Sequence, residues 1–527
     1  MIMKNVFRPI AALVLAAGVL AVPAHAAPDK TLRAVVNADL KIIDPTWSTA
    51  YVTIRHGYLV YDTLFALNSK YEAKPQMVDT YSVSKDAMIY TFKLRAGMKW
   101  HDGAPVTAAD CVASLKRWAQ RNAMGQQMMK AMDSFEVVDA LTFRIKLKQP
   151  FGLVLEALGG SEAPAFMMPA RIAEQPIDKQ ITDPIGSGPF IFKKDEWKPG
   201  NLTVYVRNPD YIPRNEPPDY LSGGKVAKLD RVEWRYINDA NTVLAALQAG
   251  EIDYFEAPPL DFVEPMKRNK DITVLKIDKL GVQMLARPNS LFPPFNNYKA
   301  RQALLYLVDQ EQAMQAVAGS PDMYLKSCPT FFICNSANES KAGSAPIMKQ
   351  NIEKARALFK EAGYKGETVT VLFPTDRPQY AAAETVLIEG LRKAGVKLDV
   401  VSLDWATITA RRAKKDPPEK GGWNLLVTSQ GGPDASSPSS NIWFNSKCAQ
   451  ANIGWACDDE LTKMIDAYAR EASAAKRRTM IDKIQERGFV SVPYVPLGQY
   501  FQPIAFRSNI KGVLLSGVPV YWNIEKQ

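Results

Sequence analysis

Histidine is scarce in this sequence: it accounts for three of the 527 residues, and only His56 and His101 lie beyond residue 26. Because histidine is the commonest general base near neutral pH, this scarcity disfavours an enzyme of the usual acid–base kind. Neither histidine lies near a cysteine pair that could complete a metal site. We therefore predict no metal site and no cofactor, and we interpret His101 as a packed, hydrogen-bonded side chain.

Catalytic motifs are also missing. The sequence has no G-x-S-x-G nucleophile elbow, no G-x-x-x-x-G-K-[ST] phosphate loop and no G-x-G-x-x-G fingerprint. Residues 473–476 match the S-x-x-K motif of serine penicillin-recognising enzymes, but the S-D-N and K-T-G partners are absent. These absences favour a binding protein over an enzyme.

Long apolar runs are confined to the amino terminus. Lys4 and Arg8 precede an apolar run of about 13 residues, which is shorter than the roughly 20 that span a bilayer as a helix. Ala24-His25-Ala26 follows as a small-x-small cleavage site, and no lipobox cysteine lies nearby. We predict a signal peptide over residues 1–26 and a mature chain outside the cytoplasm.

Cysteine is infrequent, with five residues. Cys328 and Cys334 are six positions apart, and Cys448 and Cys457 are nine apart, so each pair can close a small loop in an oxidising compartment. Cys111 lies inside an apolar helical pattern. We predict two disulfides and one buried free thiol.

The charge is basic but dispersed. The formal net charge is +10, of which Lys4 and Arg8 belong to the predicted signal peptide. The densest basic runs, residues 411–415 and 476–478, are interpreted as solvated helix faces. Export argues further against nucleic acid, so no nucleic-acid partner is predicted.

The mature chain of about 500 residues exceeds what one hydrophobic core usually serves, so at least two domains are expected. The first third alternates β-like runs with polar turns, and Thr107 with Asp110 forms a capping box at the start of a helix. Residues 209–224 are rich in proline and glycine and are expected to form a loop. The β-like runs are residues 31–36, 89–94, 143–147 and 202–207.

From about residue 297 helical patterns alternate with strand patterns, which predicts an α/β domain with a largely parallel sheet. Gly363 and Gly395 stand where helix-terminating glycines belong. A ligand between this domain and the first would occupy a cleft. The expected helices are 300–317, 351–362, 383–394 and 458–472, and the expected strands are 369–373 and 396–403.

Residues 90–111, YTFKLRAGMKWHDGAPVTAADC, resemble the signature of family 5 extracellular solute-binding proteins, which include dipeptide-, oligopeptide- and nickel-binding members. The resemblance covers essentially the whole mature chain. It is supported in the expected order by residues 43–45, 184–190, 247–253, 301–304, 362–363 and 492–497.

The resemblance implies an α/β fold of two lobes, the periplasmic-binding-protein fold, with an extra α+β subdomain inserted in lobe I. The expected division is lobe I over 27–283 with the insertion at about 50–185, lobe II over 284–498, and a return to lobe I over 499–527. The two crossings between lobes are expected near 282–287 and 495–502. The lobes of such proteins close over a buried ligand by hinge motion.

The implied function is that of a monomeric periplasmic receptor that captures a short peptide and delivers it to the permease of an ABC importer. An opine, a glycoside or a chelated metal is the alternative ligand, and an exported enzyme or chaperone is the alternative class. Bare nickel is disfavoured by the two remaining histidines.

The resemblance also implies ligand-binding residues. Residues 373–380 resemble the loop in which dipeptide-binding members anchor the peptide carboxylate, with Arg377 as the anchor and Tyr380 at the loop's end. The alternative is a surface arginine paired with Asp376. Trp405 resembles a position near the cleft, where it would pack on apolar parts of the ligand, or it is a core residue.

The acidic loop that holds the peptide amine in those members corresponds to residues 428–435, where Asp434 remains. Ser429 or Gln430 occupies the first acidic position, so the salt bridge to an amine is weakened. This change and the basic net charge favour an anionic or zwitterionic ligand. Dipeptide-binding members also carry a cysteine pair at the place of Cys448 and Cys457.

Overall fold

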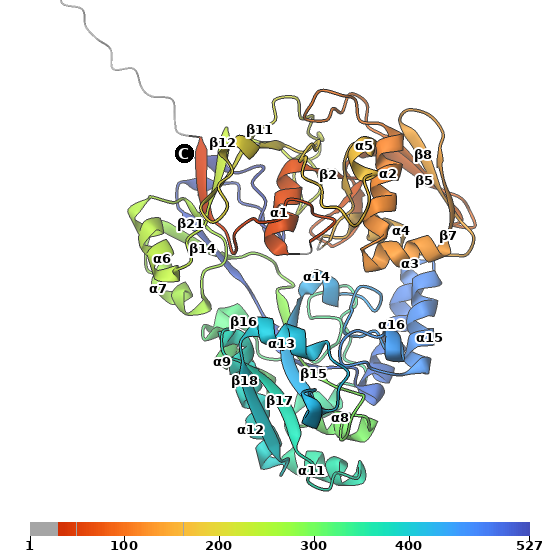
Figure 1. Cartoon of the computed structure of the whole chain (residues 1–527), viewed down its shortest axis with the longest axis vertical. Coiled ribbons are helices and arrows are strands. Elements are labelled where there is room, and N and C mark those ends of the chain that lie inside the picture. The colour runs from red at the N-terminus through yellow and green to blue at the C-terminus, as the bar shows by residue number, and fades with distance from the viewer. Residues whose placement is uncertain (1–29, 49, 162) are drawn as a thin grey trace, which may run out of the picture.

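Two main β-sheets organise the molecule, one in each half of Figure 1. The computed structural model describes residues 30–48, 50–161 and 163–527, and the predicted signal peptide lies outside these residues. We call the half around the first sheet lobe I and the half around the second sheet lobe II.

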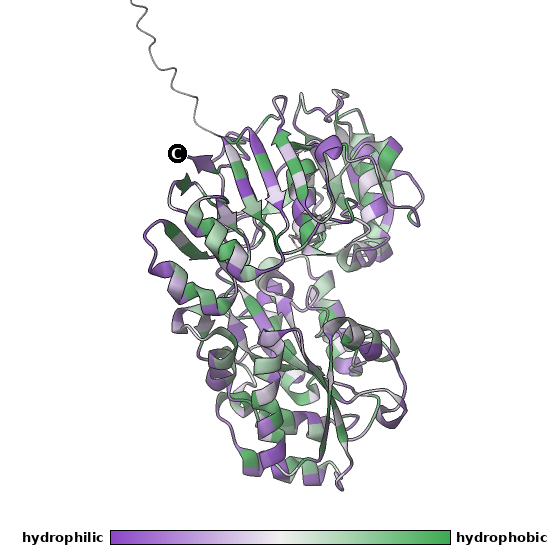
Figure 2. Cartoon of the chain, turned by 60° about the vertical axis from the view of Figure 1, so that its left-hand side comes forward, coloured by the Kyte–Doolittle hydropathy of each residue, from purple (hydrophilic) through white to green (hydrophobic). Residues whose placement is uncertain are grey.

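The sheet of lobe I has seven strands. Its β1 pairs in parallel with β12 and β13, and hydrophilic and hydrophobic residues alternate along its strands (Figure 2). This alternation buries one side of the sheet. In spatial order the strands are β10 (Phe190–Phe192), β11 (Leu202–Arg207), β12 (Arg231–Arg235), β1 (Thr31–Val35), β13 (Tyr254–Phe255), β21 (Pro503–Arg507) and β14 (Ile272–Lys276).

The sheet of lobe II has six strands and is mixed. Only the pairings of β17 with β18 and β19 are parallel, so the prediction of a largely parallel sheet is wrong. β15 enters directly from lobe I and β20 leads directly back to it, and such antiparallel neighbours need no helical crossover. In spatial order the strands are β16 (Tyr324–Leu325), β20 (Val495–Tyr500), β15 (Val282–Pro288), β19 (Leu425–Gly431), β17 (Val369–Pro374) and β18 (Leu398–Leu403).

Two short segments connect the lobes. Residues 277–281 lead from β14 to β15, and residues 501–502 lead from β20 to β21. The two crossings lie side by side, because Val282 pairs with Tyr500. A side chain at Gly281, whose φ is +58°, would place Cβ 2.3 Å from the Tyr500 carbonyl oxygen. Glycine is therefore required where the crossings approach each other.

A third sheet lies in the outer part of lobe I, beside α2 (Ala108–Ala119) and α3 (Ala123–Ala131) (Figure 1). Thr107 and Asp110 form both hydrogen bonds of the predicted capping box at the start of α2. Gly97 and Gly103 have φ of +80° and +88° in the preceding turns. The antiparallel strands are β5 (Val78–Val83), β6 (Ile89–Leu94), β8 (Thr142–Leu147) and β7 (Met132–Val137).

The helices of lobe II differ in part from the predictions. The single helix expected over 300–317 is two helices, α8 (Tyr298–Leu305) and α9 (Gln310–Ala318). The reason is Asp309, whose side chain accepts a hydrogen bond from the Gln312 backbone N–H and starts the second helix. The helices predicted at 351–362 and 458–472 are confirmed as α11 (Ile352–Glu361) and α15 (Asp459–Arg470), each with a polar cap.

Residues 473–476 begin α16 (Ala474–Ser491), which agrees with the helix face predicted for 476–478, although no bounds were predicted for this helix. The Ser473 hydroxyl accepts from the Lys476 backbone N–H, so the S-x-x-K match is a helix cap. The basic run that follows is not fully solvated. Arg477 is 6% exposed and donates to Glu156 and to three backbone carbonyls.

Candidate functional site

One edge of the lobe II sheet faces lobe I. The parallel strands β17, β18 and β19 all end at this edge, and the Val282–Tyr500 pair marks the crossings there. Ligands of open α/β sheets bind outside the carboxyl ends of parallel strands. The predicted site residues lie in the last residues of β19 or in the segments that follow these three strands.

A pocket with about 560 Å³ of empty space, including space open to solvent, lies between this edge and lobe I. Its lobe I wall is formed by α1 (Tyr51–Val60) and residues 517–518, and its lobe II wall includes the start of α14 (Gly432–Ala435), which lies beneath α1 in Figure 1. Both crossings contribute, through residues such as Asp278 and Gln502. The pocket is therefore an interlobe cleft beside the hinge.

The charged groups of this pocket already have partners. Arg55 forms an ion pair with the buried carboxylate of Glu256. Asp278 accepts hydrogen bonds from the hydroxyls of Tyr71 and Tyr220 and from the Leu280 backbone N–H. These side chains fix the hinge wall of the cleft.

Tyr380, Trp405 and Ser429 meet at the same sheet edge. The Tyr380 Oη lies 2.9 Å from the Ser429 Oγ, and the rings of Tyr380 and Trp405 are 4.8 Å apart at an angle of 62°. Tyr380 comes from α12 (Pro378–Lys393) and Trp405 begins α13 (Trp405–Arg412). The three residues form an aromatic wall with two hydroxyls, which we call the Tyr380 cluster.

Arg412 joins this cluster, although the sequence analysis assigned it to a solvated basic run. Its Cζ lies 5.2 Å from the centre of the Trp405 ring. Its Nε is buried and has no hydrogen-bond partner. Burial lowers the pKa of the guanidinium, and the nearby Tyr380 opposes this shift. Only its place seven residues after Trp405, on the same helix face, could have indicated the contact.

Arg377 takes no part in the contacts that form the Tyr380 cluster. It is exposed at the start of α12, and its side chain makes no hydrogen bond or ion pair with any residue that the structure describes. The alternative pairing with Asp376 is not formed. Asp376 instead accepts a 2.7 Å hydrogen bond from the Trp405 backbone N–H.

Gln430 points away from Ser429, because successive side chains of a strand face opposite sides of the sheet. Its Nε2 donates to Gln283 at 2.9 Å and to the Tyr494 hydroxyl at 3.3 Å, within the interior of lobe II. Asp434 is half-buried in α14, and its backbone carbonyl accepts from the Ser440 hydroxyl. The structure thus brings three of the six predicted ligand residues into contact.

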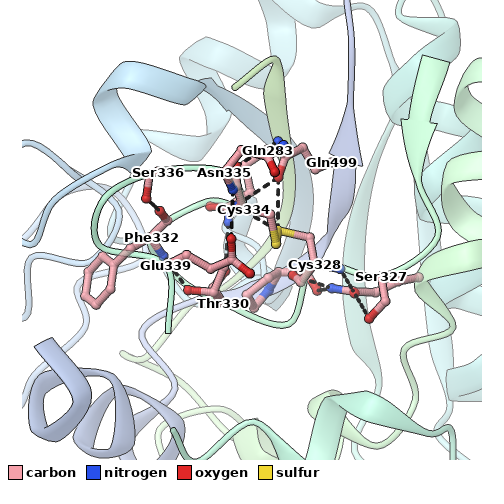
Figure 3. Close-up of a disulfide and its surroundings, with 12 residues drawn as sticks. Gln283, Ser327, Cys328, Thr330, Phe332, Cys334, Asn335, Ser336, Glu339 and Gln499 are labelled. Carbon is pink, nitrogen blue, oxygen red and sulfur yellow. Dashed lines mark hydrogen bonds between the residues drawn. A yellow bond between two sulfur atoms is a disulfide. The ribbon is translucent and has the colours of Figure 1, made fainter. Parts of the chain in front are cut away.

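The predicted disulfide between Cys328 and Cys334 is confirmed and fastens a loop against both crossing strands (Figure 3). Gln499 of β20 donates to the carbonyls of Leu280 and Cys334, and its Oε1 accepts from the Cys334 backbone N–H. Gln283 of β15 donates to the Thr330 carbonyl at 2.9 Å. The loop therefore holds β15 and β20 together below the hinge.

The remaining cysteines and His101 also agree with the predictions. Cys448 and Cys457 form the second disulfide, and Cys111 is a buried free thiol. His101 lies with Nε2 3.1 Å from the Gly188 carbonyl, and burial lowers its pKa to about 4. Across the described part of the chain, no group of three or more His, Cys, Asp or Glu could hold a metal ion.

Comparison with known proteins supports this reading of the fold. The model of the bacterial extracellular solute-binding proteins, family 5 (middle), matches residues 72–452. The probable peptide ABC transporter periplasmic-binding protein y4tO of Sinorhizobium fredii is 38% identical over 509 residues, 95% of this chain and 94% of the relative. The glutathione-binding protein GsiB of Salmonella typhimurium is 27% identical over 507 residues, 93% of this chain and 92% of the relative.

A solved structure shares the fold over nearly its full length. The ABC transporter-associated periplasmic binding protein DppA of Helicobacter pylori, in complex with the peptide STSA, has a TM-score of 0.76 at 22% identity. The match covers 94% of this chain and 98% of that chain. Within residues 30–48, 50–161 and 163–527, no helix combines the length and the apolar character needed to cross a membrane. The chain belongs to family 5 of the bacterial extracellular solute-binding proteins, the components of ABC importers that bind a solute and deliver it to the membrane permease.

Proposed function

We propose that this protein captures a short peptide, or a peptide-like zwitterion, between its lobes for import. The Tyr380 cluster carries the proposal, because it offers an aromatic wall and hydroxyl groups at the carboxyl edge of the lobe II strands. The names of relatives point the same way: y4tO is named for peptide transport and GsiB for glutathione binding.

In this proposal each part of the site meets one part of the ligand. Trp405 and Tyr380 pack on apolar side chains, and the paired hydroxyls of Tyr380 and Ser429 hydrogen-bond to the peptide backbone. Arg377 is exposed at the mouth of the site, where its charge attracts an anionic ligand before the lobes close. Gln430 is assigned to the interior network of lobe II and not to the ligand.

The amine of the ligand has fewer binding partners in this site than the carboxylate has. Asp434 is the acidic residue of the loop after β19, and it reaches the ligand if α14 moves on closure. A buried ammonium without an acidic partner is costly, so ligands whose amine is blocked or solvated should also bind. This sets the proposed specificity apart from that of a strict receptor for free dipeptides.

The protein is further proposed to be exported by cleavage after Ala26 and to act without catalysis. Native mass spectrometry before and after denaturation of protein from the exporting host will identify a co-purified ligand. We expect short peptides at one per chain, released unchanged. A single non-peptide metabolite would reject the peptide ligand, and consumption of the ligand would reject a purely binding role.

A matched pair of variants tests the location of the site. Tyr380→Ala removes a ring and a hydroxyl from the cluster, whereas Tyr298→Ala removes an exposed ring at the start of α8. For a peptide that binds the wild type, we expect Tyr380→Ala to weaken affinity at least about tenfold, or about 1.4 kcal/mol. Equal affinities in a calorimetric titration would move the site away from Tyr380. Saturating ligand at about 100 times the Kd should stabilise the wild type by about 2.7 kcal/mol.

A further inference from the structure

Arg412 is half-buried, and it differs from the buried arginines Arg287 and Arg301 of lobe II in having no acceptor for its side chain among the described residues. Arg287 donates to the backbone carbonyls of four residues, and Arg301 donates to two. The neighbouring Arg411 donates twice to the Gly422 carbonyl. The side chain of Arg412 has no hydrogen bond or ion pair with any described residue, and its Nε is shut off from water.

An unsatisfied buried donor is unfavourable by about 1–3 kcal/mol, and more when it is charged. A solvated lysine or glutamine at this place would avoid that penalty. The position therefore suits a donor whose acceptor arrives with a bound ligand.

The geometry directs Arg412 towards the proposed site. Side chains of a helix lean towards its amino terminus, and the amino terminus of α13 lies at the carboxyl end of β18. The guanidinium accordingly lies over the Trp405 ring, 5.2 Å from its centre, and is close enough to Tyr380 for that residue to act on its pKa. Stacking on an aromatic ring orients the planar fork of an arginine before an anion binds.

We propose that Arg412 binds the carboxylate of the ligand, held in place by Trp405, whereas Arg377 acts only at the exposed mouth of the site. The assignment rests on the proposed function and specifies its ligand as a carboxylate-bearing molecule. A guanidinium can meet a carboxylate with two parallel hydrogen bonds, which satisfies the donors that are unpaired in the free protein.

The test compares trialanine with its carboxyl-terminal amide in calorimetric titrations of five proteins: wild type, Arg412→Gln, Arg412→Lys, Arg377→Gln and Lys414→Gln. Lys414 is the control, because it is exposed in the same basic run. We expect the wild type to prefer the free acid at least about tenfold. Arg412→Gln should abolish this preference and Arg412→Lys should retain part of it. Arg377→Gln and Lys414→Gln should keep it.

A preference that survives in Arg412→Gln but disappears in Arg377→Gln would overturn the assignment. If the wild type binds neither tripeptide, trialanine is not a ligand, and native mass spectrometry of the co-purified ligand then decides the role of Arg412. If the co-purified ligand bears a carboxylate, its absence from purified Arg412→Gln and its presence in Lys414→Gln would support the assignment. Equal ligand occupancy in the two variants would reject it. Thermal unfolding of the free proteins controls for folding, since Arg412→Gln removes an unsatisfied charge and should not lower the Tm.

Discussion

The two lobes handle buried charge in different ways. In lobe I buried cations face carboxylates: Arg117 lies 3.1 Å from Asp44, and Lys225 lies 2.7 Å from Asp62. In lobe II two of the buried arginines, Arg287 and Arg301, bond only to neutral backbone carbonyls, whereas Arg477 reaches the Glu156 carboxylate of lobe I. Burial lowers the pKa of Arg287 to about 9 and that of Arg301 to about 10.

This difference has structural consequences. An ion pair completes the charge balance inside lobe I, so that lobe needs no external partner for these groups. Arg287 instead ties together the carbonyls of residues 443, 452, 453 and 493, and leaves its positive charge uncompensated. Together with the unpaired Arg412 beside Trp405, these arginines leave lobe II with positive charge that no carboxylate balances, which suits the anionic group of the proposed ligand.

The strongest test of the comparison is to break a lobe I pair. Asp44→Asn leaves Arg117, whose side chain is 1% exposed, without a counter-charge. We expect a loss of about 3–5 kcal/mol in the free energy of unfolding. Urea denaturation measures it, with Glu136→Gln as the control because Glu136 forms exposed pairs and should matter little. Equal stability of the two variants would contradict a dependence of lobe I on its buried pairs.

His56 sharpens the comparison, because it is a buried titratable group of lobe I that bonds to a neutral partner, the Tyr205 hydroxyl. Burial lowers its pKa from 6.5 to about 3. Below pH 6.5 this histidine takes up a proton in the unfolded chain but not in the folded chain. Its contribution to the free energy of unfolding is therefore fully present only above pH 6.5. It is lost as the pH falls towards 3, by about 2 kcal/mol at pH 5.

Unfolding titrations of the wild type and His56→Gln between pH 7 and pH 5 measure this loss. We expect the variant to have the shallower pH dependence. His101, whose pKa is also lowered, to about 4, contributes in the same direction in both proteins. Identical slopes would mean that His56 is protonated in the folded protein.

The smallest expected effect concerns Glu384 in lobe II, which is fully buried with neither carboxyl oxygen hydrogen-bonded. Burial raises its pKa, and the backbone of Val427 opposes the shift. Its stability contribution is therefore full below the ordinary pKa of 4.5 and is lost as the pH rises through the folded pKa. Glu384→Met should stabilise the protein by about 1 kcal/mol at pH 7.5, because it removes an unsatisfied buried group.

This gain should shrink as the pH approaches 4.5. Glu389→Gln on the same helix is the control, because Glu389 is exposed and pairs only with Lys393 at the surface. Thermal unfolding at both pH values compares the three proteins. A loss of stability in Glu384→Met would show that the carboxyl has a bonded role in the fold.

Local signals in the sequence predicted local structure well. The strands β6 and β11 begin and end at the predicted residues, and Thr107 caps α2 as its spacing indicated. Both disulfides follow from short spacings in an exported chain. The break between α8 and α9 was missed, although the Asp309 cap was visible in the sequence. These features depend on neighbours within a few residues.

The site was predicted only in part. The sequence singled out Tyr380, Trp405 and Ser429, but their contact depends on three strand ends that meet at one edge of the sheet. The resemblance assigned Gln430 to the ligand because it stands at the first acidic position of the family's loop. The structure instead gives its amide the partners Gln283 and Tyr494, and this follows from the register of β19 with β15, which the sequence does not show.

By itself the sequence determined the family, the caps and turns, and the cysteine pairs, because each rests on residue types at short, fixed spacings. The tertiary structure decided which charges are paired. Arg412 and Arg477 both lie in basic runs, yet one stands unpaired over Trp405 and the other is buried against Glu156. The partners of a long side chain come from distant segments, so only the packing of the lobes determines whether its charge is solvated, neutralised or left for a ligand.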